Sequence, residues 1–173
     1  MANMNLDPVT KSRIDIKLYK NVKNMKQLKE KLLKGELTCS LVKPSLICDP
    51  FQIIVAANKA LTSEKLTTKS VYTEILFNLS ISKNISNSLQ TFGSSESDKE
   101  LLVVTVNEYA DVSNDSKIHH HISGEEIPIA CLSDYCDISL IRKVYKVNSK
   151  EYNVISLLNS IVSRISTKDF LSH

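Results

Sequence analysis

By residue type, the four histidines and four cysteines among the 173 residues are the best candidates for chemistry. Three histidines are consecutive, His119 to His121. Adjacent side chains point apart on a strand and lie about 100° apart on a helix, so the triplet does not converge on one ion. No H-x₃-H pair and no C-x-x-C pair accompanies it. The sequence therefore predicts no metal site, an exposed loop for the triplet, and free thiols at Cys39, Cys48, Cys131 and Cys136.

The familiar motifs of enzymatic chemistry are also missing. The sequence holds no glycine-rich phosphate loop, no G-x-S-x-G elbow and no H-E-x-x-H pair. Nothing in it singles out one thiol as activated. We therefore predict that the chain is not an enzyme, has no catalytic residue and uses no cofactor. A small thiol-dependent hydrolase or transferase stays open as an alternative.

Length and composition indicate one ordinary globular domain. The chain is 42% hydrophobic and 24% charged, and it is long enough to bury a core. We predict a single domain over residues 1–173, with a flexible segment at 1–11. The formal net charge of +3 permits contact with phosphates without requiring it. No signal peptide and no run of about 18 apolar residues is present, which predicts a soluble intracellular protein.

The apolar pattern predicts alternating strands and helices. Strands are expected at residues 13–18, 72–79, 101–106 and 141–147. Helices are expected at residues 24–35, 50–62, 84–92 and 148–165, each after a capping residue. The predicted fold is a single α/β domain in which helices cover a mixed four- to five-stranded sheet. Residues 107–137 are the least regular part of the pattern.

The strongest helix signal begins at Asp49. Asp49 is a good N-cap, Pro50 suits the first helical position, and Gln52 completes a capping box. The following helix is apolar almost all the way round, which predicts burial on most sides. Asn58 falls on the buried side and needs hydrogen-bond partners there. Only Gln52 and Lys59 form a polar stripe, so we expect these two residues to face solvent.

Four blocks of sequence, in order, resemble the TPRKB family, the small kinase-binding subunit of the KEOPS (EKC) complex. The blocks are residues 49–60, 74–80, 84–86 and 164–169. The likeness extends over nearly the whole chain, but residues 107–126 have no counterpart that we can place. The resemblance implies a non-catalytic part in forming threonylcarbamoyladenosine next to the anticodon of tRNA. Another subunit would perform the transfer.

The resemblance also implies two partners. The first is the atypical kinase/ATPase subunit of KEOPS, which the family binds and stimulates, and we expect it to contact Ile85 and Leu89. The second is the 3′ CCA end of tRNA, whose phosphates we expect to contact Lys59, Lys83, Arg164 and Lys168 without reading sequence. For each of these cations the alternative is an ordinary solvated surface charge. A monomer without a membrane partner, located in the cytoplasm and nucleus, is expected; a stand-alone tRNA- or RNA-binding module stays open as the alternative function.

Overall fold

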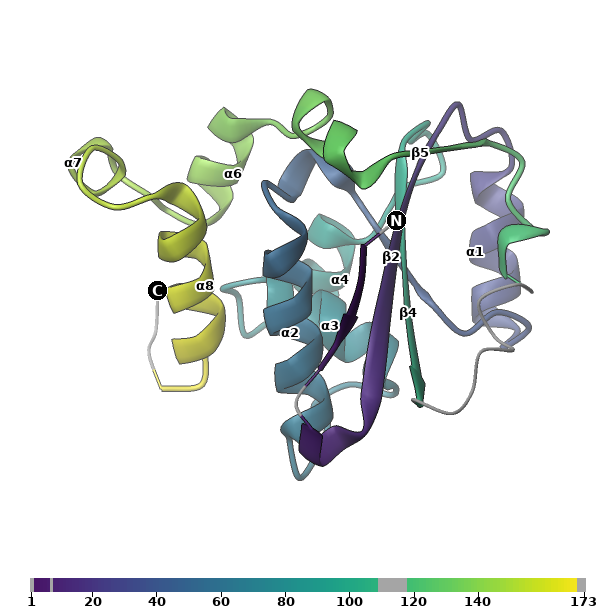
Figure 1. Cartoon of the computed structure of the whole chain (residues 1–173), viewed down its shortest axis with the longest axis horizontal. Coiled ribbons are helices and arrows are strands. Elements are labelled where there is room, and N and C mark those ends of the chain that lie inside the picture. Colours follow the sequence, from purple (N-terminus) through teal and green to yellow (C-terminus); the bar gives the residue numbers. More distant parts are fainter. Residues whose placement is uncertain (1, 7, 109–117, 171–173) are drawn as a thin grey trace.

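The computed structural model describes residues 2–6, 8–108 and 118–170, which form one α/β domain around a five-stranded sheet (Figure 1). The strand order is β1-β2-β4-β3, and β5 pairs with the same strand β2 beyond the end of β1. All described strand pairs are antiparallel, so the sheet is not mixed. The strands are β1 (Ala2–Asn5), β2 (Ser12–Lys20), β3 (Ser40–Val42), β4 (Leu101–Glu108) and β5 (Glu125–Ile127).

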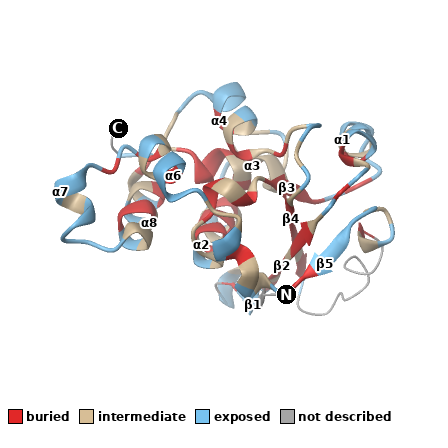
Figure 2. Cartoon of the chain, turned by 90° about the horizontal axis from the view of Figure 1, so that it is seen from above, coloured by how far each residue is buried: buried red, intermediate tan, exposed pale blue. Residues whose placement is uncertain are grey.

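Helices cover both faces of the sheet, and α2 is the central one. Helix α1 packs on one face, whereas α2 lies on the other face, with α3, α4 and α8 beyond it (Figures 1 and 2). The helices are α1 (Met25–Leu33), α2 (Pro50–Thr62), α3 (Val71–Leu79), α4 (Ile85–Phe92), α6 (Ile138–Val144), α7 (Ser149–Tyr152) and α8 (Leu157–Thr167). Short 3-10 turns occur at Pro8–Thr10, Pro44–Leu46 and Ile129–Asp134.

Strand β2 divides the core into two clusters because its side chains alternate between the faces. Ile14, Ile16 and Leu18 are fully buried in the larger cluster, on the side of α2. Tyr19 belongs to the smaller cluster, which lies under α1. The predicted single α/β domain is therefore confirmed, as are the predicted strands at 13–18 and 101–106.

Two predicted strands are wrong, because both segments are helical. Residues 71–79 form α3, which lies between α2 and α4 and therefore carries apolar residues on both sides. Ser70 and Thr73 form a capping box at its start, a signal that the near-continuous apolar run obscured. Residues 138–144 form α6, whose cap Asp137 accepts a hydrogen bond from the Leu140 amide at 2.9 Å.

The ends of the chain also differ from expectation. Ala2–Asn5, within the segment expected to be flexible, pair with β2 as strand β1. The helix predicted at 148–165 is two helices, α7 and α8, separated at Asn153–Ser156. Asn148 does cap the first of them, accepting from the Glu151 amide at 2.9 Å. Among the described residues, no helix is both long enough and apolar enough to cross a membrane.

The start of α2 shows one confirmed prediction and one wrong one. Asp49 caps the helix, accepting a hydrogen bond from the Phe51 amide at 2.8 Å. Gln52, however, does not face solvent and does not complete a capping box. Its side chain is fully buried, and its Nε2 donates to Tyr145 Oη at 2.7 Å and to the Leu46 carbonyl at 3.1 Å. Gln52 therefore fastens α2 to α6 through the core.

Candidate partner and nucleic-acid surfaces

Helix α4 presents an uncharged surface with one exposed large apolar side chain. Asn84 caps it by accepting from the Asn87 amide at 2.9 Å. Its inner side is held by Phe92, which is fully buried, and by Ser88, whose hydroxyl donates to the Asn84 carbonyl at 2.8 Å. No residue of α4 is charged. The outer side carries Ile85, which is 38% exposed, so this predicted partner residue is available to a partner.

Leu89 lies at the border between α4 and an apolar pocket. The pocket has a volume of about 480 Å³, and Leu89 lines it together with Leu76 of α3 and Leu32 of α1. Gly93 closes α4 tightly, because a Cβ at this position would lie 2.5 Å from the Leu89 carbonyl oxygen. Leu89 itself is half-buried. The structure thus brings both predicted partner residues to one helix, one exposed and one at a pocket wall.

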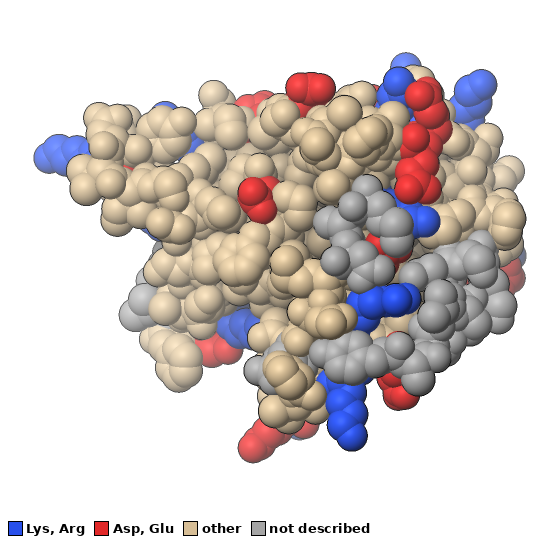
Figure 3. All heavy atoms as spheres, viewed as in Figure 1, with Lys and Arg blue, Asp and Glu red and all other residues tan. Residues whose placement is uncertain are grey.

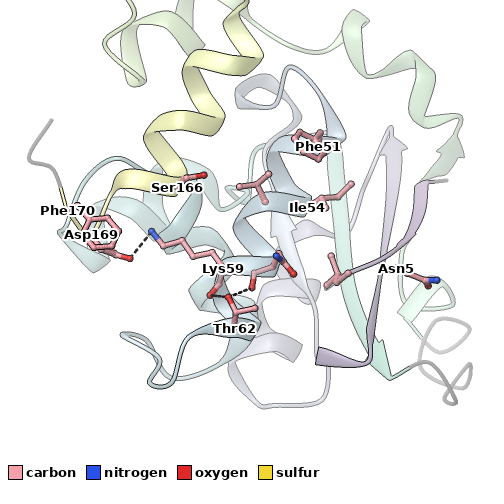
Figure 4. A pocket seen from close by; sticks show the side chains of 11 residues that line it. Asn5, Phe51, Ile54, Lys59, Thr62, Ser166, Asp169 and Phe170 are labelled. Carbon is pink, nitrogen blue, oxygen red and sulfur yellow. Dashed lines mark hydrogen bonds and ion pairs between the residues drawn. The ribbon is translucent and has the colours of Figure 1, made fainter. Parts of the chain in front are cut away.

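A second pocket, of about 520 Å³, lies between β1, α2 and the end of α8 (Figure 4). Its lining combines apolar, aromatic and polar side chains, with Phe51 on α2 and Phe170 after α8 both exposed, at 44% and 85%. Lys59 points from α2 toward the C-terminal segment (Figure 4). Its Nζ lies 2.9 Å from Asp169 Oδ2 and donates to the Ile165 carbonyl at 3.0 Å. Lys59 was expected to face solvent, but its side chain lies instead in the wall of this pocket.

The other three predicted tRNA contacts lie in three different environments. Lys83 is exposed and forms no hydrogen bond or ion pair within the described part of the chain. Arg164 makes a bidentate pair with Glu151, at 2.6 and 2.8 Å, and also donates to the Ser160 carbonyl at 3.2 Å. Arg164 is therefore already used to join α7 to α8.

Lys168, which was predicted to contact phosphate, is buried in the structure, at 1% exposure. Its Nζ donates to the Phe77 carbonyl and lies 3.2 Å from the centre of the Phe77 ring. Burial, helped by the nearby charges of Lys59 and Lys83, lowers the pKa of Lys168 to about 8. Asp169 and Glu74 act in the opposite direction. Lys168 therefore anchors the end of α8 on α3.

The thiols are poorly suited to nucleophilic chemistry. Burial raises the pKa of Cys39 to about 12 and that of Cys48 to about 11, and it also raises the pKa of Cys136. A nucleophilic cysteine needs the opposite shift. All four thiols are free, as predicted. In the described ranges, no three His, Cys, Asp or Glu side chains gather in a way that could hold a metal ion.

The histidine triplet is only partly an exposed loop. His120 is exposed, but the His119 ring stacks on Tyr19 with ring centroids 6.1 Å apart, and its Nε2 lies 2.6 Å from Lys17 Nζ. His121 Nδ1 lies 2.8 Å from Lys31 Nζ on α1. The triplet therefore joins α1 to the sheet, which the sequence pattern did not predict. The partner residues lie about 100 positions away in sequence, beyond the reach of any local signal.

Comparison with known proteins gives one consistent result. The family model described as kinase binding protein CGI-121 matches residues 19–169. The "EKC/KEOPS complex subunit TPRKB" of Danio rerio is 37% identical over 155 residues, which cover 88% of this chain and 89% of the relative. The "EKC/KEOPS complex subunit cgi121" of Aspergillus fumigatus is 32% identical over 171 residues, covering 89% and 90%. These matches confirm the resemblance seen in the four sequence blocks, and the chain belongs to the CGI-121 family of kinase-binding proteins.

Proposed function

We propose that this chain is the non-catalytic, kinase-binding subunit of a KEOPS complex, which binds and stimulates the kinase-like ATPase subunit. The observation that carries this proposal is the match to the kinase-binding family over residues 19–169. The names of its relatives support the complex, since the similar proteins from Danio rerio and Aspergillus fumigatus are both named as EKC/KEOPS subunits. The raised thiol pKa values argue against the alternative of a thiol-dependent enzyme.

The chemistry of α4 supports it as the surface for the kinase-like subunit. Protein interfaces concentrate their binding free energy in a few apolar anchors surrounded by a polar rim. Ile85 is such an anchor, with Asn84, Ser86 and Asn87 exposed around it. Leu89 and the pocket behind it extend the apolar surface toward α1. The inner face is fixed by Phe92, so the helix is already ordered before a partner binds.

The pocket beside Lys59 supports recruitment of the 3′ end of tRNA as the second part of this role. A single-stranded end is held by cations along its phosphates and by aromatic rings on which bases stack. The exposed rings of Phe51 and Phe170 and the ammonium of Lys59 line one pocket. Lys83 adds an exposed cation near Lys168, the residue that fixes the end of α8. We therefore assign phosphate contact to Lys59 and Lys83, and a structural role to Arg164 and Lys168.

Mixing the chain with the kinase-like subunit of the same organism tests the first part. Size-exclusion chromatography should give one peak that contains both proteins in equal amounts, and the ATPase rate of the kinase-like subunit should rise. Two separate peaks with an unchanged ATPase rate would contradict the proposal.

The second part is tested by tRNA binding with and without the CCA end. Removal of the CCA end should weaken binding if the pocket holds that end. A stand-alone RNA-binding module would bind both forms equally through backbone phosphates, and its affinity would fall steeply with salt. Equal affinity for the two forms would therefore favour the alternative function.

A further inference from the structure

The pocket that Lys59 lines is also lined by an acidic side chain of the chain itself, Asp169. Asp169, two residues after α8, places Oδ2 2.9 Å from Lys59 Nζ (Figure 4). The neighbouring carbonyl of Ile165 accepts from the same ammonium at 3.0 Å. Lys59 is thus held in position by the helix carbonyl, and its charge is matched by the Asp169 carboxylate.

The Lys59–Asp169 ion pair is solvent-exposed on one side. The Asp169 side chain is 61% exposed, whereas that of Lys59 is 17% exposed. Ion pairs with one well-solvated partner contribute little to stability, so their separation costs little. A phosphodiester of RNA carries one negative charge, as the carboxylate does, and can accept the same charge-assisted hydrogen bond from Lys59, so it can take the place of Asp169. If Asp169 moves away, Lys59 Nζ can keep its hydrogen bond to the Ile165 carbonyl.

The Arg164–Glu151 ion pair differs from the Lys59–Asp169 pair in being shielded from solvent. The Arg164–Glu151 pair is bidentate, and its side chains are only 17% and 19% exposed. A ligand cannot replace Glu151 without separating α7 from α8. The Lys59–Asp169 pair has a single carboxylate contact, on a residue beyond the last turn of α8.

The charges around Asp169 also favour an incoming anion. Lys59 and Lys83 each lie close enough to Lys168 to act on it electrostatically. The negative groups in this cluster are Asp169 and Glu74. Glu74 is buried, and its Oε2 accepts from the Thr68 amide and hydroxyl at 2.7 Å each, so it cannot leave. Asp169 is therefore the exchangeable anion of this cluster.

We propose that Asp169 is a built-in competitor that occupies Lys59 in the unliganded chain and is displaced by a phosphate of the single-stranded RNA end. This inference rests on the proposed tRNA-recruiting function and adds a specific regulation of that site. RNA that lacks a phosphate able to reach Lys59 would not remove Asp169.

The test measures binding of a fluorescent single-stranded RNA ending in CCA to the full chain. Asp169→Asn keeps the shape of the side chain and removes the competing charge, so the RNA should bind about two- to fivefold more tightly, the range expected for an exposed ion pair. Glu30→Gln is the matched control, because it changes the net charge equally on the exposed side of α1, across the sheet. It should change affinity clearly less.

A second pair of variants shows whether Lys59 transmits the effect. In a Lys59→Met background, Asp169→Asn should no longer tighten binding, because the competed cation is gone. The competitor model is overturned if wild type binds the RNA and Asp169→Asn binds no more tightly than Glu30→Gln. If neither wild type nor Asp169→Asn binds the RNA at all, the proposed recruitment of tRNA by this pocket fails, and the competitor model with it.

Discussion

Helices α4 and α8 are built alike at their starts but differ in how their outer surfaces are used. A side chain caps each helix, Asn84 for α4 and Ser156 for α8. Arg164 of α8 is paired with Glu151, and the segment after α8 is fixed on α3 through the buried Lys168. On α4 the outer surface has no charge, and Ile85 remains exposed. Polar side chains of α8 and of the segment after it are therefore engaged within the chain, whereas Ile85 on α4 is left exposed.

The face of the molecule over α2, α6 and α8 shows few charges, as the space-filling view indicates (Figure 3). Exposed apolar residues also occur outside α4, including Val154 between α7 and α8, which is 84% exposed. Exposure alone thus does not distinguish α4 as an interface. The distinction must come from experiments that compare equivalent substitutions in the two regions.

The largest expected difference is in folding stability. Ile165 on α8 is fully buried, and Ile165→Ala should lower the free energy of unfolding by about 3 kcal/mol through lost contacts and a cavity. Ile85→Ala on α4 should cost less than about 1 kcal/mol, because that side chain is partly exposed. Urea denaturation of both variants measures this. Equal losses would show that α4 is as much a part of the core as α8.

The next effect is a pH dependence that belongs to the α8 end. Burial lowers the pKa of Lys168 to about 8 in the folded chain, from an ordinary 10.5. Charging this buried amine disfavours folding below pH 8, and the penalty is relieved as the pH rises from about 8 toward 10.5. Relative to Lys168→Met, wild type should gain stability over that interval, on the order of 2 kcal/mol. A parallel pH dependence of the two proteins would contradict a buried charged lysine.

A smaller loss of stability is expected from the shielded ion pair. Arg164→Ala should destabilise the chain by about 1–2 kcal/mol, because it leaves the half-buried Glu151 carboxylate without its partner. Lys83→Ala, which removes a cation without a partner among the described residues, is the matched control and should be nearly neutral. Thermal unfolding of both variants, read beside wild type, separates the two roles.

The same pair predicts an acid response. The hydrogen bond from Arg164 lowers the pKa of Glu151 to about 2, from an ordinary 4.5. The resulting stabilisation is fully present above about pH 4.5 and is lost as the pH falls toward 2. Arg164→Ala should lack this part of the acid dependence. If the variant and wild type lose stability in parallel, Arg164 is not structural and returns as a candidate for phosphate contact.

The smallest effect concerns RNA binding. Lys83→Ala should weaken tRNA binding only a few-fold and lower the slope of log affinity against log salt concentration by about 1, the signature of one lost phosphate contact. Kinase binding should be measured on the same variant, because Lys83 lies next to the cap of α4. An unchanged salt slope would remove Lys83 from the RNA-binding surface.

The sequence predicted best those elements whose pattern is decided locally. Asp49 and Asn84 cap their helices as expected, and the strands at 13–18 and 101–106 follow their apolar patterns. It failed where tertiary packing changes the meaning of the pattern. Helix α3 is apolar on both sides because it lies between α2 and α4, so its residues 74–77 gave the signature of a buried strand.

Sequence also predicts poorly which residues of the candidate surfaces are exposed and which are already paired. The family resemblance predicted Ile85 as a partner contact, but its 38% exposure came only from the structure. Whether a lysine is free or already paired depends on residues far away in sequence, such as Ile165 for Lys59 and Phe77 for Lys168. The same holds for Gln52, whose buried partner Tyr145 lies 93 positions later. Burial of a polar residue therefore had to come from the three-dimensional structure.

The central claim, that α4 is the surface for the kinase-like subunit, is tested most directly by one affinity measurement. Isothermal titration calorimetry of the kinase-like subunit should be made with Ile85→Asp and with Val154→Asp, which places the same charge on an exposed residue beside α8. We expect Ile85→Asp to weaken binding at least about tenfold, as the loss of an apolar anchor does, and Val154→Asp to bind as wild type. Binding of Ile85→Asp at wild-type affinity, with the fold intact by circular dichroism, would contradict the claim.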